Sequence, residues 1–169
     1  MNRGVIIVGY QGIGKSTLAN RSLNYIDLES SNFNLDEGKV LNWQNYYCKI
    51  AISLASQGYA VFVSSHKVVR DYLTTHTFPA GVDLIACVPS HDLREEWIKR
   101  LEDRYLETGL DKDMRALKNA LERYDENIDE ILDDISDTCV ISSMQYNLEK
   151  VLFLKFQQLG ILYYPYPSV

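Results

Sequence analysis

Nine residues near the N-terminus have the types and spacing of a phosphate-binding turn: Gly9-Tyr10-Gln11-Gly12-Ile13-Gly14-Lys15-Ser16-Thr17. They match the pattern G-x-x-x-x-G-K-[ST], the P-loop. Glycines let backbone N–H groups approach a polyphosphate, and a following helix would direct its positive end at the same anion. We expect Lys15 to contact the β- and γ-phosphates and the Ser16 hydroxyl to ligate Mg²⁺. The residues expected to bind the nucleotide are Gly9, Gln11, Gly12, Ile13, Gly14, Lys15, Ser16 and Thr17.

The elements around this motif give it the context that the chemistry requires. Short apolar runs predict strands at Val5–Val8, Tyr25–Leu28, Tyr59–Val63, Val82–Val88 and Thr138–Ser142. Apolar residues at spacings of three and four predict a helix starting near Lys15 and further helices at Asp36–Gln57, Lys67–Thr75, His91–Glu107, Asp113–Ile135 and Leu148–Leu159. Strands alternating with helices indicate an α/β fold with a five-stranded, mainly parallel sheet. A chance glycine-rich turn is the alternative for the motif, and the strand before it and helix after it argue against that.

Composition restricts the class of protein. The chain has 169 residues, 46% of them hydrophobic and 24% charged, which favours one globular domain over residues 1–169. No apolar run is long enough to span a membrane, and three cysteines without a CxxC pair suggest neither a disulfide framework nor a zinc site, so a cytoplasmic location is expected. The net charge of −6 argues against a nucleic-acid partner, because phosphate neutralisation needs a basic surface.

The exact form of the motif, G-x-x-G-x-G-K-S-T, resembles the loop of the small P-loop kinases: the nucleoside monophosphate kinases, shikimate kinase and gluconate kinase. The resemblance implies a three-layer P-loop NTPase fold that uses ATP and Mg²⁺. It also implies a helical acceptor arm at about residues 30–57 and a helical lid at about residues 91–136. A guanine-reading N-K-x-D is not found in the sequence, which argues against a GTPase.

An acidic pair follows the second predicted strand. Asp27 and Glu29 resemble the D-x-D of shikimate and gluconate kinases, with Glu in place of the second Asp. Residues two apart on a strand point to one face, so both could reach the cleft. We expect Asp27 to act as catalytic base or to hold a metal-bound water, and Glu29 to contact the acceptor. The alternative is that Asp27 only ends a strand. Since 12 positions separate Lys15 from Asp27, the first helix must be short.

The third predicted strand ends in a small polar turn that resembles the corresponding turn of gluconate kinase. Ser65, His66 and Arg70 are acceptor-site candidates there, because α/β proteins bind ligands at the carboxyl ends of parallel strands. Arg70 suits bidentate contact with a phosphate or carboxylate, and its alternative is a surface ion pair. No Asp ends this strand, so metal binding would fall to Ser16 and Asp27.

The predicted lid carries two arginines, Arg100 and Arg104, that share one helix face. The resemblance implies that such arginines stack on adenine or neutralise the transferring phosphoryl group. The alternative is a helix stabilised by salt bridges to neighbouring acids. In the acceptor arm, Trp43, Tyr46 and Tyr47 could stack on a base or sugar, although aromatic residues at helical spacing are more often core.

These observations predict phosphoryl transfer from ATP to a small acceptor, first a nucleotide or nucleoside. A sugar acid or other metabolite is the second choice. A nucleotide-binding regulator or ATPase, and a kinase of nucleic-acid ends or modified bases, are the alternatives from other classes. The Tyr/Pro-rich tail, Ile161–Val169, is expected to lie extended, either on its own core or on a second copy in a homodimer.

Overall fold

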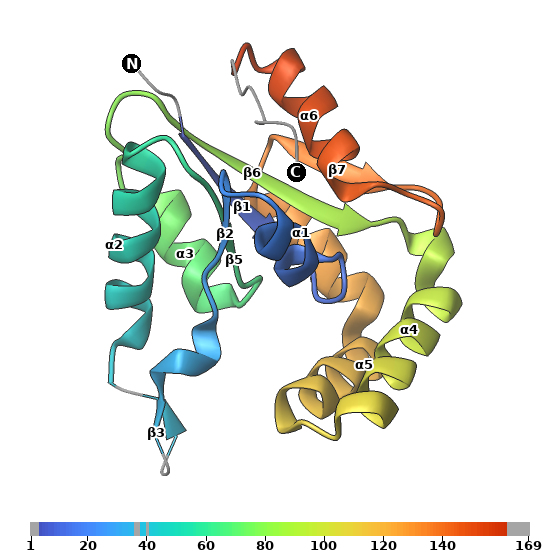
Figure 1. Cartoon of the computed structure of the whole chain (residues 1–169). Helices are drawn as coiled ribbons and strands as arrows, with labels where there is room; N and C mark the ends of the chain where they lie inside the picture. Colours follow the sequence, from blue (N-terminus) through green and yellow to red (C-terminus); the bar gives the residue numbers. More distant parts are fainter. Residues whose placement is uncertain (1–3, 36–37, 40, 162–169) are drawn as a thin grey trace.

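The computed structural model describes residues 4–35, 38–39 and 41–161, and its centre is a five-stranded sheet (Figure 1). The strands are β1 (Gly4–Gly9), β2 (Tyr25–Asp27), β5 (Ala60–Val63), β6 (Val82–Pro89) and β7 (Thr138–Ile141). Their order is β2-β5-β1-β6-β7, and every neighbouring pair is parallel. The α/β fold with a five-stranded parallel sheet, predicted from the sequence, is confirmed.

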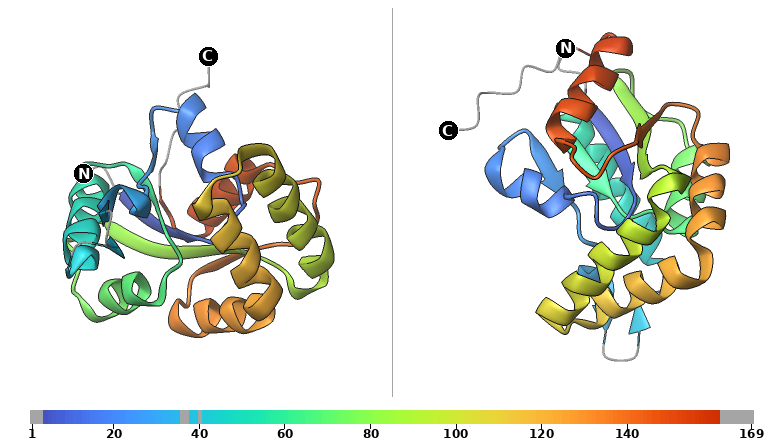
Figure 2. Two further views of the ribbon diagram at one scale, coloured as in Figure 1. Left: turned by 90° about the horizontal axis from the view of Figure 1, so that it is seen from below. Right: turned by 90° about the vertical axis from the view of Figure 1, so that its right-hand side faces the viewer.

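Helices cover both faces of this sheet (Figure 2). The helices are α1 (Lys15–Arg21), α2 (Trp43–Ser56), α3 (Lys67–Thr75), α4 (Arg94–Thr108), α5 (Asp111–Asp134) and α6 (Leu148–Gln158). In Figure 2, α1 and α6 lie on one face, and α2, α3 and the C-terminal part of α5 lie on the other. This three-layer arrangement brings the carboxyl ends of the strands to one edge, where α/β proteins bind ligands.

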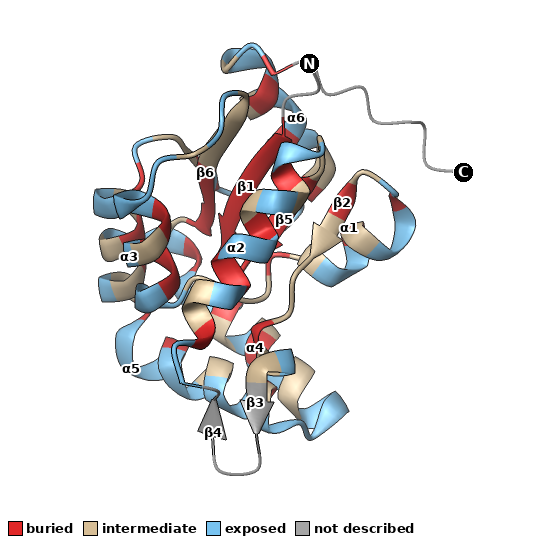
Figure 3. Ribbon diagram, turned by 90° about the vertical axis from the view of Figure 1, so that its left-hand side faces the viewer, coloured by how far each residue is buried: buried red, intermediate tan, exposed pale blue. Residues whose placement is uncertain are grey.

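The core is built on the three central strands. All four residues Val5–Val8 and the whole of β5 are buried, as is the C-terminal half of β6 (Figure 3). Burying one Val or Ile side chain contributes roughly 1.5–3 kcal/mol, so these continuous apolar runs are the main source of stability for the sheet. The loop after β1 is therefore attached to a strand that is buried along its whole length.

The predicted helix Asp36–Gln57 is wrong in its first third. The described residues between η1 (Ser30–Phe33, a 3₁₀ turn) and α2 form a two-stranded antiparallel hairpin, β3 (Asn34–Leu35) and β4 (Gly38–Lys39). Asn42 then adopts φ 55°, a left-handed conformation that cannot continue a helix, and α2 begins at Trp43. The apolar spacing that predicted the helix is real only from Trp43 onward.

The region predicted as a lid is a pair of helices, α4 and α5, that pack against each other. The 3₁₀ turn η2 (His91–Leu93) precedes α4, so the predicted helix start at His91 is an irregular turn. Within α5, Arg123 has non-helical angles (φ −144°, ψ 29°), which kink the helix. The kink divides α5 into an outer half, beside the tip of α4, and an inner half, packed under the sheet.

The predicted extended tail falls mostly on residues 162–169, outside the described part of the chain. Its first residue, Ile161, is buried and donates its N–H to the Phe156 carbonyl at 2.9 Å. Among the described helices, none combines the length and apolar character needed to cross a membrane.

Candidate functional site

The loop of residues 9–17, called the glycine loop below, joins the end of β1 to α1. Gly12 (φ 86°) and Gly14 (φ 103°) adopt left-handed conformations that disfavour other residues. The Lys15 ammonium curls back over the loop and donates to the Gly9 carbonyl at 3.1 Å. No described side chain caps the N-terminus of α1, and the hydroxyl-bearing Ser16 and Thr17 are exposed there. The loop therefore carries three kinds of group that can bind a phosphate: backbone N–H groups, the Lys15 ammonium and the hydroxyls of Ser16 and Thr17.

Helix α4 lies directly on the glycine loop. The indole N–H of Trp97 donates to the Gln11 carbonyl at 2.8 Å, and Arg100 donates to the Gly12 carbonyl at 3.3 Å. A Cβ on Gly12 would stand 3.0 Å from Leu101 and 3.2 Å from the Trp97 indole nitrogen. Gly12 is thus needed twice, for its backbone angles and for the close approach of the lid helix.

Five charged side chains from the glycine loop, from β2 and the residues after it, and from the two lid helices lie within electrostatic reach of one another: Lys15, Asp27, Glu29, Arg104 and Lys112. Burial lowers the pKa of Lys15, and the nearby carboxylates of Asp27 and Glu29 oppose that shift. Burial raises the pKa of Asp27, and Lys15 opposes it. A lysine and a carboxylate that perturb each other's pKa are typical of a functional site. That Asp27 and Glu29 both reach the cleft stays a prediction.

The lid contributes two ion pairs to this charged cluster. Lys112, in the first turn of α5, lies 3.6 Å from a Glu29 carboxylate oxygen, and so connects the lid tip to the loop after β2. Burial acts to raise the pKa of Glu29, but the hydrogen bond from the Ser31 N–H and the charge of Lys112 outweigh it and lower the pKa. Arg104 lies 2.8 Å from the buried carboxylate of Asp113. The first pair joins the lid to the residues after β2, and the second joins the two lid helices to each other.

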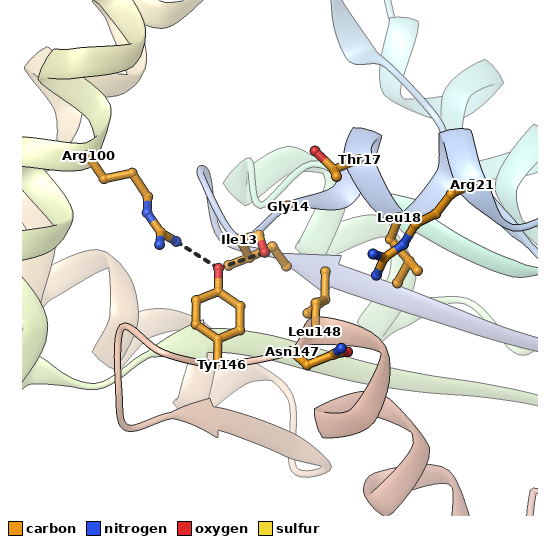
Figure 4. A pocket seen from close by; sticks show the side chains of 9 residues that line it. All are labelled: Ile13, Gly14, Thr17, Leu18, Arg21, Arg100, Tyr146, Asn147 and Leu148. Carbon is orange, nitrogen blue, oxygen red and sulfur yellow. Dashed lines mark hydrogen bonds between the residues drawn. The ribbon is translucent and has the colours of Figure 1, made fainter. Parts of the chain in front are cut away.

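A cavity of about 260 Å³ opens on the other side of the glycine loop (Figure 4). It is lined by Ile13, Gly14, Thr17, Leu18, Arg21, Arg100, Tyr146, Asn147 and Leu148. Arg100 donates to the Tyr146 hydroxyl at 2.8 Å, and that hydroxyl donates to the Ile13 carbonyl at 2.7 Å. The Arg100 guanidinium also lies 4.6 Å from the Trp97 ring centre. A planar cation, a phenol and apolar side chains thus surround a space next to the loop.

The aromatic residues of the acceptor arm are mostly core. Tyr47 is fully buried and its hydroxyl donates to the Leu28 carbonyl at 2.6 Å, while it accepts the Ser64 N–H at 2.8 Å. Trp43 packs edge-on against Tyr47, at 5.5 Å between ring centres. The alternative interpretation, core packing, therefore describes both residues, and Tyr46 points outward with 57% of its surface exposed. Tyr47 positions the end of β2, which carries Asp27, against the end of β5.

Arg70 is not where the acceptor-site prediction needs it. Its side chain is 4% exposed, and each of its three guanidinium nitrogens donates one hydrogen bond: to the Ser65 carbonyl at 3.1 Å, to Asp134 and to Glu130. The two acids belong to the inner half of α5, so Arg70 ties α3 to the base of the lid. Its partners make it a buried structural cation, neither an acceptor ligand nor the surface ion pair considered as the alternative.

The remaining predicted residues lie in different places around the glycine loop. Ser65 and His66 follow β5, and the exposed His66 packs edge-on against Trp43 with ring centres 5.9 Å apart. Gln11 turns its side-chain amide away from the loop and toward α5, donating to the Ala116 carbonyl at 3.0 Å. Arg100 and Arg104 share a face of α4 as expected, but Arg100 contacts the cavity and Arg104 the charged cluster.

Neither Tyr146 nor Lys112 is among the site residues predicted from the sequence. Tyr146 follows β7, whose carboxyl end lies at the same sheet edge as the glycine loop, so its position after a predicted strand was the available signal. Lys112 could not be placed because nothing in the sequence shows how the outer end of the lid folds back over the cleft.

Comparisons with known proteins find little. No protein-family model matches the chain, and no curated protein matches it. Among solved structures, a gluconokinase from Sinorhizobium meliloti 1021 superposes with a TM-score of 0.49 and 15% identity, over 95% of this chain and 93% of that one. A likeness of this size carries no conclusion about activity or substrate.

Proposed function

We propose that this protein transfers the γ-phosphoryl group of ATP to a small hydroxyl-bearing acceptor. The observation that carries the proposal is that Lys15, on a loop of left-handed glycines, and Asp27, at the end of β2, each affect the pKa of the other beside Arg104 of α4. Phosphoryl transfer needs mainly positioning and charge neutralisation, and these residue types supply both.

The two sides of the glycine loop have different roles in this proposal. The loop N–H groups and Lys15 bind the polyphosphate, as P-loop glycines and lysine do. The adenine base occupies the cavity beyond Thr17, where Arg100 and Tyr146 form one wall. An arginine guanidinium can stack on an aromatic base, so Arg100 could bind adenine as it binds Trp97.

Magnesium fits the residues present on the loop. Mg²⁺ is usually held by one or two protein oxygens together with phosphates and waters. The exposed Ser16 hydroxyl and the half-buried Asp27 carboxylate are such oxygens. The described residues contain no cluster of three or more His, Cys, Asp or Glu that could hold a metal ion. Phosphate oxygens and waters would therefore supply the other ligands of Mg²⁺. Bound Mg²⁺ would neutralise phosphate charge.

Asp27 orients the acceptor hydroxyl and accepts its proton. Burial raises its pKa, which makes it a stronger base than an ordinary carboxylate, and the charge of Lys15 acts in the opposite direction. Arg104 lies within electrostatic reach of both Lys15 and Asp27, so it can stabilise negative charge on the transferring group.

The charges of the cleft favour a nucleoside over a nucleotide or a sugar acid. The two lid cations of the charged cluster already have partners: Arg104 pairs with Asp113, and Lys112 pairs with Glu29. Arg70, on α3, is buried against Glu130 and Asp134. An anionic acceptor would have to displace one of these carboxylates. A neutral polyol or nucleoside would instead use Glu29 as a hydrogen-bond acceptor for its hydroxyl groups.

The test is ADP formation from Mg-ATP with a panel of nucleosides, nucleoside monophosphates, sugar acids and short DNA. We expect stimulation by a nucleoside and its loss in Lys15→Ala, with Lys99→Ala as the matched control, because Lys99 is exposed and pairs only with Asp103 within the described chain. Stimulation by a sugar acid or DNA would replace the acceptor class. ATP loss that no acceptor stimulates would favour the regulator or ATPase reading, and turnover retained by Lys15→Ala would refute the phosphotransferase.

A further inference from the structure

Two of the three cysteines, far apart in sequence, are neighbours in the sheet. Cys87 in β6 and Cys139 in β7 are direct partners in the parallel register of these strands. Both thiols are free and buried. The pairing was invisible in the sequence, where an odd number of cysteines without a CxxC motif suggested no disulfide.

The spacing of paired strands brings the two residues within disulfide range. Neighbouring strands lie about 4.8 Å apart, and Cα atoms joined by a disulfide are about 4.4–6.8 Å apart. The Cβ atoms of a disulfide must approach to about 3.8 Å, closer than strand spacing brings them, so the bond would pull the strands locally. Strained disulfides are more easily reduced than relaxed ones, which makes such a bond reversible.

The surroundings give the two sulfurs different chemistry. The neighbouring Cys87 thiol lowers the pKa of Cys139, and the ammonium of Lys155 acts in the same direction. The neighbouring Cys139 thiol and burial raise the pKa of Cys87. Because β7 is the last strand of the sheet, Cys139 is also nearer to solvent, at 7% exposure against 0% for Cys87. Cys139 is therefore the nucleophile of the pair and Cys87 its resolving partner.

We propose that Cys87 and Cys139 form a reversible disulfide between β6 and β7 when the protein meets a hydroperoxide. The Cys139 thiolate attacks the outer peroxide oxygen, the O–O bond breaks, and the alcohol or water leaves with a proton while Cys139 becomes a sulfenic acid. Cys87 then loses its proton and attacks the Cys139 sulfur, the S–O bond breaks, and hydroxide leaves as water. Two thiols lose two electrons, and the peroxide gains them.

This disulfide would lie beneath the glycine loop. The Cys87 carbonyl accepts the N–H of Tyr10, the second residue of the loop, at 3.0 Å. A strand shift at Cys87 would therefore act on the first hydrogen bond that anchors the loop to the sheet.

The third cysteine provides an internal control. Cys48 on α2 is fully buried, its thiol approaches the Val69 carbonyl at 4.0 Å, and burial raises its pKa to about 12. A thiol with that pKa is almost wholly protonated and reacts slowly with peroxide. Cys48 should therefore remain reduced under conditions that oxidise the pair.

The experiment treats the folded wild-type chain with hydrogen peroxide, quenches it, and counts thiols after denaturation. We expect the count to fall from three to one, and a dithiol reductant to restore three. Peptide mapping without reduction should find one linked pair containing Cys87 and Cys139. Cys48→Ser should keep that link, and Cys139→Ser should abolish it. Mapping of the wild-type protein decides the question even if Cys139→Ser fails to fold.

Three thiols after peroxide treatment of the wild-type protein would overturn the proposal. A linked peptide containing Cys48, or a link between two chains in place of the internal one, would overturn it as well. Sulfinic acid on Cys139 without a link to Cys87 would show that the pair does not resolve, with the same consequence.

Discussion

Replacing Arg70 by methionine tests whether this residue serves the fold or the substrate. Methionine keeps most of the buried stem and removes the guanidinium. The structure places that group against the Ser65 carbonyl and the carboxylates of Glu130 and Asp134, with 4% of the side chain exposed. We therefore expect Arg70→Met to destabilise the protein and to leave acceptor binding unchanged.

The size of the effect follows from the exposure of each partner. The Ser65 carbonyl loses its side-chain donor, a loss of about 1 kcal/mol. Glu130 and Asp134 are 41% and 36% exposed, so water can replace much of what Arg70 supplies, and only the Asp134 pair is counted, at about 0.5 kcal/mol. The sum is about 1.5 kcal/mol, which at a urea m-value of about 1.5 kcal/mol/M lowers the unfolding midpoint by about 1 M.

Urea unfolding followed by circular dichroism measures this loss. Arg94→Met is the matched control: Arg94 is 51% exposed and lies 3.9 Å from Asp125, so its removal should change stability by less than about 0.5 kcal/mol. A double-mutant cycle with Asp134→Asn should give a coupling energy of about 0.5–1 kcal/mol between Arg70 and Asp134.

Kinetics separates this explanation from the sequence-based one. If Arg70 bound the acceptor, Arg70→Met would raise the acceptor KM by about tenfold or more at unchanged stability. That result, or a coupling energy near zero, would refute the structural role. A midpoint lowered by about 1 M with a KM changed less than about twofold would support it.

Three further predictions concern the cleft and the lid. Asp27→Asn should lower turnover by about 100-fold or more while ATP affinity, measured by calorimetry, changes less than about threefold; wild-type turnover would remove Asp27 from the reaction. Tyr146→Phe removes the hydroxyl that joins Arg100 to Ile13 and should weaken ATP binding by about fivefold, so unchanged affinity would place the base elsewhere. The hydrogen bond from His91 to Asp125, helped by Asp129, raises the pKa of His91, so its stabilisation is complete below the ordinary value of 6.5 and is lost as pH rises through the folded value. The stability difference between wild type and His91→Asn should therefore shrink by about 0.5 kcal/mol between about pH 6 and about pH 9, and a difference independent of pH would contradict it.

The fold and the turn of the glycine loop were predictable because they depend on local patterns. The β-branched run Val5–Val8 could be read as a strand buried on both faces, and the glycine spacing fixed where the chain must turn. The short first helix followed from the distance between Lys15 and Asp27. Each of these features is determined by residues that are neighbours in the chain.

The features that escaped prediction depend on contacts between distant segments. Arg70 looked like a ligand because its two acid partners lie 60 and 64 residues away on α5. Tyr146 reaches the glycine loop only because β7 pairs with β6. The start of α2 was misjudged because an apolar spacing continued across Asn42, whose left-handed backbone the spacing does not reveal.

The two tryptophans lie in different parts of the molecule. Trp97 is buried between the glycine loop and the Tyr146 ring, and Trp43 packs in the acceptor arm against Tyr47 and His66. The chain contains only these two indoles, so replacing either one by phenylalanine leaves a single tryptophan, which can be excited at wavelengths that the 12 tyrosines do not absorb. The fluorescence of one variant would report on the nucleotide side and that of the other on the acceptor side. Adding ATP and acceptor in turn would then separate the order of binding without any label.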